Sequence, residues 1–237
     1  MTSLVGYELK DGIATLTMDD GKANVMSYAM LQALNGALDR ALADKAVVLL
    51  AGREGMFSGG FDLSVFKAGK PQDQLKMLEA GALMAERLLS FPLPVVAACT
   101  GHAVAMGVFL LLCADVRVGV DQGARFQANE VQIGMTLPYF AIEVCRQRLV
   151  PAHFNLTCVT AMPYTPQTAL GAGFLDEIAP ASSLVAQAQG AAVRLKSLNA
   201  EAFAATKLRL RHNTLKALRT AITDDIAGWT ARFGGTT

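Results

Sequence analysis

Apolar side chains recur with the strand period and the helix period in turn up to residue 180, and with the helix period alone after it. The pair Asp11-Gly12 supplies the positive φ of a tight hairpin turn, and Ser27 can cap a helix. We expect strands over residues 7–10, 13–18, 46–51, 95–100, 115–120 and 125–128. We expect helices over residues 28–43, 75–89, 105–114 and 138–149, at Pro151 and Pro166, and from 182 to about 233.

The most apolar stretch runs from Pro92 to Asp115 and organises the rest of the chain. The pattern predicts a buried strand up to Thr100, a turn over Gly101–Ala103 and a buried helix over residues 105–114. A transmembrane helix is the alternative, but prolines and a glycine interrupt the stretch. A helix that follows a strand and a glycine turn directs backbone N–H groups at whatever lies above the turn. Such a turn suits an anion or a developing negative charge.

The order of elements predicts an α/β core over residues 1–180, which would hold the site, and a helical C-terminal region over residues 181–237. The 237 residues suit one large domain, and a hydrophobic content of 52% suggests buried oligomer contacts. A formal net charge of +1 gives no reason to expect nucleic acid or a membrane as a partner. Four cysteines without C-x-x-C spacing predict buried reduced thiols. No signal peptide is recognisable, so we expect a cytoplasmic location.

Two glycine-bearing loops that follow strands remain as candidate chemistry, because the motifs of phosphate loops, dinucleotide sites, zinc sites and nucleophile elbows are not recognisable. These loops are Phe57–Leu63, which reads F-S-G-G-F-D-L, and Gly101–Gly107. Each alone is typical of a tight turn, with Asp62 as a helix cap. Together they could direct two N–H groups at one oxygen and form an oxyanion hole. His102 could act as a base, although a lone histidine in such a turn is more often a packing residue.

Glu130 is the candidate base, because it follows a short strand and lies among apolar residues. Its alternative is an ordinary surface or ion-paired glutamate. In an apolar pocket, burial would raise its pKa into the working range of a general base.

These motifs together resemble the crotonase (enoyl-CoA hydratase/isomerase) superfamily over nearly the whole chain. The resemblance implies a spiral of ββα units followed by a helical trimerisation region. It puts Gly59 at the position whose N–H holds the thioester oxygen. It puts Met106, in T-G-H-A-V-A-M-G-V-F-L-L-L-C-A-D, at the second donor position, which is usually glycine.

Phe109 departs from the pattern of the hydratases, which carry a glutamate there and a second glutamate at the position of Glu130. A single carboxylate can still move a proton between two carbons, which is the reaction of the Δ3,Δ2-enoyl-CoA isomerases. The segments N-E-V-Q-I-G and L-P-Y-F are similar to the catalytic segment of those isomerases. Phe109 would also keep water out.

By the same resemblance, five residues would line the coenzyme A end of the site, with an exposed loop as the alternative for the first two: Lys22, Ala23, Phe61, Asp62 and Leu63. Three cations could meet coenzyme A phosphates or form a solvated helix face: Lys207, Arg209 and Arg211. The acyl pocket would draw on six residues, for which ordinary core packing is the alternative: Phe109, Val65, Phe66, Met135, Leu137 and Phe140.

The sequence therefore predicts isomerisation of 3-enoyl-CoA to 2-enoyl-CoA, with an acyl-CoA thioester as substrate and no metal or redox cofactor. The alternatives are an enoyl-CoA hydratase, another lyase or thioester hydrolase of the superfamily, and a catalytically silent acyl-CoA-binding protein. We expect a homotrimer or a dimer of trimers.

Overall fold

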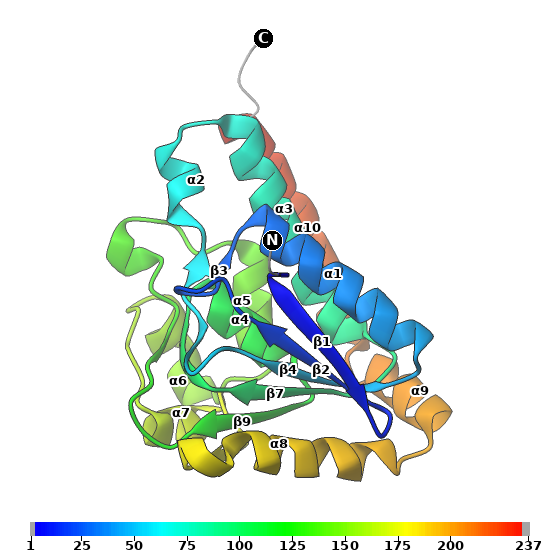
Figure 1. Ribbon diagram of the computed structural model, residues 1–237. Helices are drawn as coiled ribbons and strands as arrows, with labels where there is room; N and C mark the ends of the chain where they lie inside the picture. The colour runs from blue at the N-terminus through cyan, green and yellow to red at the C-terminus, as the bar shows by residue number, and fades with distance from the viewer. Residues whose placement is uncertain (1–2, 234–237) are drawn as a thin grey trace.

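The computed structural model describes residues 3–233 and is built around a six-stranded sheet with the order β1-β2-β4-β7-β9-β11 (Figure 1). Strands β1 and β2 are antiparallel, and every later neighbour pair in this sheet is parallel. The strands are β1 (Val5–Lys10), β2 (Ile13–Met18), β4 (Val47–Ala51), β7 (Val95–Cys99), β9 (Val116–Val120) and β11 (Glu177–Ala179).

Two smaller sheets lie beside the main one and carry the glycine-bearing loops. One has the order β10-β8-β5, and the other pairs β3 with β6. Their strands are β10 (Phe126–Gln127), β8 (Gly101–Val104), β5 (Gly55–Ser58), β3 (Val25–Met26) and β6 (Gly60–Phe61). The predicted turn at residues 101–103 is therefore wrong, because these residues form β8. An added Cβ on Gly101 would lie 1.9 Å from the carbonyl carbon of Gly55, so glycine permits the close parallel pairing of β8 with β5.

Helices cover both faces of the main sheet, as the continuous apolar runs predicted for β4 and β7. On one face, α8 (Ala181–Lys196) packs Leu184 and Ala188 against Val96 and Val118. It runs along the bottom of the sheet in Figure 1. On the other face lie α1 (Tyr28–Ala43), α3 (Pro71–Ser90), α4 (Met106–Cys113), α5 (Tyr139–Arg146) and α10 (His212–Phe233).

The remaining elements are short helices at the edges: α2 (Leu63–Lys67), η1 (Val131–Ile133), α6 (Pro151–Cys158), α7 (Pro166–Ala172) and α9 (Ala200–Leu210). The helices expected after residue 182 are confirmed, and the first of them packs against the sheet rather than standing apart from it. Within residues 3–233, no helix has the length and apolar character that a membrane crossing requires.

Local signals in the sequence are confirmed where they depend on neighbours in the chain. Asp11 and Gly12 have φ values of 51° and 72° and turn β1 into β2. The side chain of Ser27 accepts the N–H of Met30 at 3.2 Å and caps α1, a contact of roughly 1 kcal/mol. Cys99, Cys113 and Cys145 are buried, whereas Cys158 is only half-buried; all four are free thiols.

Candidate active site

The first turn of α4 leaves backbone N–H groups open. The helix begins after Ala105, which has φ 49° and ψ −126° and offers no side-chain cap. The N–H groups of Val108 and Phe109 donate to the carbonyl oxygen of Ala105. Within residues 3–233, the N–H of Met106 has no acceptor. This end of the helix can therefore donate to a developing negative charge.

The loop that contains Gly59 and Gly60 packs directly against this turn. Gly60 has φ 96°, and an added Cβ would lie 2.7 Å from Cβ of Ala105 and 3.4 Å from N of Met106. An added Cβ on Gly107 would lie 2.4 Å from the carbonyl oxygen of Ser58. Glycine at these positions lets the two loops meet, as their spacing in the sequence predicted.

The N–H of Gly59 is not an open donor, which corrects the role assigned to it. This N–H donates to the carbonyl oxygen of Ala23 at 2.8 Å, and that of Gly60 donates to Oγ of Ser58 at 3.2 Å. The cause is the pairing of β3 with β6, which brings residues 23–26 alongside the loop. A two-residue strand such as β3 has no recognisable period, so this acceptor could not be predicted from the pattern of apolar residues.

Glu130 lies beside these loops as a buried carboxyl group. The residue is 6% exposed, and its Oε2 is buried without a hydrogen-bond partner in the described part of the chain. Burial raises the pKa of Glu130 to about 7. Its carbonyl oxygen accepts the N–H of Met135 at 2.8 Å, which fixes the turn through η1. The backbone that carries Glu130 is therefore fixed, and burial brings the pKa of its carboxyl group near neutral pH.

A cavity of about 60 Å³ joins Glu130 to both loops. Phe109 is 1% exposed and lines this cavity, with its ring edge-on to Phe140 at 6.1 Å between centroids. Glu130 is the only ionisable side chain in the wall, as far as the described residues go. The wall consists of Gly59, Phe61, Leu63, Phe66, Leu78, Ala105, Phe109, Asn129, Glu130, Ile133, Met135 and Pro138.

The cavity shares part of its wall with a larger outer pocket of about 460 Å³. Four residues belong to both: Leu63, Phe66, Ile133 and Met135. The outer pocket adds Lys67 and Gln74 and, from the end of α10, Arg232 and Phe233. The arrangement combines an apolar chamber, one carboxyl group and open backbone donors, and it can support proton transfer next to a polarised carbonyl group.

A profile of the family described as "Enoyl-CoA hydratase/isomerase" matches residues 8–233. This chain belongs to that family. Among solved structures, a probable enoyl-CoA hydratase of Mycobacterium tuberculosis is 46% identical, with a TM-score of 0.92 over 98% of this chain and 96% of that one. An enoyl-CoA isomerase of the same organism is 47% identical, with a TM-score of 0.91 over 96% of this chain and 99% of that one. The crotonase fold is thus established.

The chain spans about half the length of two curated relatives that it matches. A probable enoyl-CoA hydratase of Bacillus subtilis is 31% identical over 54% of this chain and 50% of the relative. Another of Rhodobacter capsulatus is 32% identical over 52% of this chain and 49% of the relative. Taken with the solved structures above, the names of these similar proteins include both hydratase and isomerase.

Phe66 and Met135, which were expected in the acyl pocket, line the cavity with Phe109, and so do Phe61 and Leu63, which were expected at the coenzyme A end. Three other residues predicted for the acyl pocket do not line this cavity, and their role in the acyl pocket stays a prediction. Leu137 and Phe140 are core residues, and Val65 is half-buried on α2. Phe140 stands behind Phe109 and holds its ring.

The predicted coenzyme A residues keep their role as a prediction. Lys22 is exposed, and its N–H donates to the carboxylate of Asp20. Ala23 uses its carbonyl oxygen to accept from Gly59. Asp62 caps α2 by accepting the N–H of Ser64 at 2.9 Å.

The solvated helix face predicted for the C-terminal cations is wrong for two of the three. Lys207 and Arg211 are buried and both pair with Asp115, whereas Arg209 is exposed. His102 is a packing residue, because its Nδ1 accepts the N–H of Arg125 at 3.0 Å.

Asn129 is a site residue that the sequence reasoning missed. It lines the cavity, and its Oδ1 is buried without a partner among the described residues. Its position next to Glu130 was the one available signal.

Proposed function

We propose that this protein isomerises 3-enoyl-CoA to 2-enoyl-CoA with Glu130 as the proton carrier. One observation carries the proposal: the cavity wall holds a single buried carboxyl group with a pKa of about 7, and Phe109 lines the same chamber where a second carboxylate would be needed for hydration. A base whose pKa lies near the working pH combines a populated ionised form with enough basicity to act.

The reaction needs one proton to leave C2 and one to arrive at C4. The Glu130 carboxylate takes the C2 proton, and the electron pair moves toward the thioester oxygen to give a dienolate. The protonated Glu130 then returns the proton to C4, and the double bond shifts to C2–C3. Atoms and charge balance over the cycle, so we propose that no resident cofactor is required.

The thioester oxygen would be held by backbone N–H groups. Met106 supplies one, because its N–H is open at the start of α4. We propose no second donor from the loop of Gly59, since Gly59 and Gly60 already have acceptors and Phe61 is paired with Met26 between β3 and β6. Each such donor typically contributes about 10²–10³-fold in rate.

Hydration of 2-enoyl-CoA is the second candidate. The unpartnered Oδ1 of Asn129 beside Glu130 is a polar atom that could hold a water molecule. The names of the relatives support this activity as well as isomerisation. Against it, the lining is otherwise apolar and Phe109 lines the same cavity as Glu130.

Initial rates of the purified protein on 3-enoyl-CoA and on 2-enoyl-CoA, followed by absorbance under the same conditions, test the proposal. We expect isomerisation to exceed hydration. Faster hydration would favour the second candidate, and tight acyl-CoA binding without turnover of any thioester would favour a silent binding protein.

A further inference from the structure

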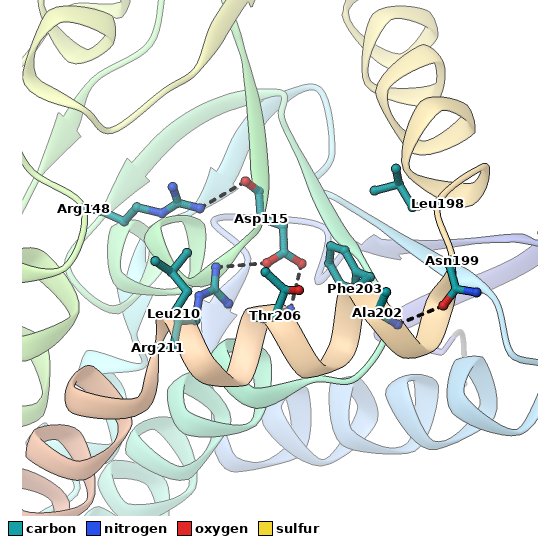
Figure 2. Close-up of a pocket in the computed structure, with 10 residues that line it drawn as sticks. Asp115, Arg148, Leu198, Asn199, Ala202, Phe203, Thr206, Leu210 and Arg211 are labelled. Atoms are coloured by element: carbon teal, nitrogen blue, oxygen red, sulfur yellow. Dashed lines mark hydrogen bonds and ion pairs between the residues drawn. The ribbon is translucent and has the colours of Figure 1, made fainter.

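A third pocket, of about 480 Å³, is lined by residues of α9 and of the chain on either side of it. In Figure 1, α9 and α2 lie toward opposite ends of the molecule. Its rim is apolar: Leu198, Phe203 and Leu210 line it, and Leu210 is 82% exposed. Its floor is charged, and Figure 2 shows Asp115 approached by Arg211, which directly follows α9, and by Arg148, from the chain after α5.

The floor holds one carboxylate and three cations. The Asp115 carboxylate accepts from Nζ of Lys207 at 2.7 Å and pairs with Nη2 of Arg211 at 2.9 Å. Nη2 of Arg148 donates to the backbone oxygen of Asp115 at 3.0 Å. Lys207 and Arg211 are only 6% and 7% exposed, so these charges have little water around them.

Among residues 3–233, Asp115 is the only carboxylate that forms an ion pair with these cations. The next ion pair, between Arg117 and Asp176 at 2.6 Å, is balanced in itself. Together the two groups leave a formal excess of two positive charges among residues that are largely buried, and such burial costs several kcal/mol when no counter-charge is present. The thiol of Cys113 adds no negative charge, because burial raises its pKa to about 12.

Some N–H groups of these cations have no acceptor among the described residues. Nε of Arg148 is buried and has no acceptor among the described residues. Lys207 uses one of its three N–H bonds on Asp115, and Arg211 uses Nη1 on the carbonyl oxygen of Leu89. Burial also lowers the pKa of Lys207 to about 8 and that of Arg148 to about 10, as expected where positive charge is under-compensated.

We propose that this pocket binds an oxyanion, the phosphate or carboxylate group of a ligand whose apolar part rests on Leu198, Phe203 and Leu210. The oxyanion would accept hydrogen bonds from Lys207 and Arg211 and supply the missing negative charge. The site is distinct from the cavity around Glu130 and does not depend on the proposed reaction.

Thr206 offers a direct test, because it is exposed and lines the pocket (Figure 2). Thr206→Glu brings a tethered carboxylate to the site, and Thr206→Gln is the neutral control of the same shape. Neither change removes a partner of Asp115, so both variants should fold. Thermal unfolding is followed in an amine buffer with inorganic phosphate or with octanoate, against sodium chloride at matched ionic strength.

Wild type and Thr206→Gln should show a saturable rise in Tm, of roughly 3–6 °C at tenfold above the Kd. Thr206→Glu should unfold at a higher Tm than Thr206→Gln without added anion and should bind the probes about tenfold more weakly or worse. A response to phosphate alone identifies a phosphate group, and a stronger response to octanoate identifies an apolar carboxylate. Equal responses of the two variants, or no saturable rise in wild type, would overturn the proposal.

Discussion

Glu130→Gln tests two effects of the buried carboxyl group: its role in catalysis and its effect on the stability of the fold. Burial raises the pKa of Glu130 from 4.5 to about 7. The folded protein therefore holds this proton more tightly than the unfolded chain does. The contribution of Glu130 to stability is largest below the unfolded pKa of 4.5 and falls as the pH rises through the window up to about 7. A shift of this size corresponds to about 3 kcal/mol of stability lost across the window.

The variant removes this pH dependence, because glutamine does not titrate. Urea unfolding gives the stability of wild type and of Glu130→Gln at pH 4.5 and at pH 8, so the difference between the two proteins can be compared at the two pH values. Any cost of burying the amide is the same at both pH values and cancels. We expect the stability of Glu130→Gln, relative to wild type, to rise by about 3 kcal/mol between acid and alkaline pH.

The same variant should lose activity. Isomerase turnover should fall by at least about 10²–10⁴-fold while acyl-CoA binding stays close to wild type. In wild type, turnover should decline as the pH falls below about 7, because protonation removes the base. A stability difference that does not change with pH would refute the burial argument, and a variant with full turnover would refute the assignment of the base.

Three further predictions test the loops, the chamber and the assembly. Gly60→Ala should lower the free energy of unfolding by about 1–3 kcal/mol and reduce turnover, because φ is 96° and the new Cβ would lie 2.7 Å from Cβ of Ala105. Gly36→Ala, in an open position on α1, is the control, and urea unfolding should find it neutral or slightly stabilising. Phe109→Glu should give partial hydration of 2-enoyl-CoA and lower stability, and Phe109→Gln separates the effect of charge from that of shape. If Phe109→Glu gains no hydratase activity, Phe109 is not what prevents hydration. Light scattering should find a homotrimer or a dimer of trimers, and a monomer across the micromolar range would contradict this.

Some site features were visible in the chain because they depend on close neighbours. Residues 57–63 and 101–107 both carry glycines after an apolar strand, and the two loops do meet. Glu130 stands among apolar residues and is buried, as its context indicated. Family resemblance added the significance of Phe109, which composition alone could not supply.

The amino-acid sequence by itself determined the long periodic elements, the hairpin at Asp11-Gly12, the Ser27 cap and the candidate base, since each depends on a local pattern of polarity or on one local hydrogen bond. Only the tertiary structure decided which donors and charges are free. The N–H of Gly59 is taken by Ala23, 36 positions earlier, through strands too short to show a period. Lys207 pairs with Asp115 across 92 positions, so an alternating basic pattern on a helix became a buried cluster. Periodicity specifies which face of an element is buried, but the partner that completes a hydrogen bond or an ion pair is chosen by chain segments that meet only on folding.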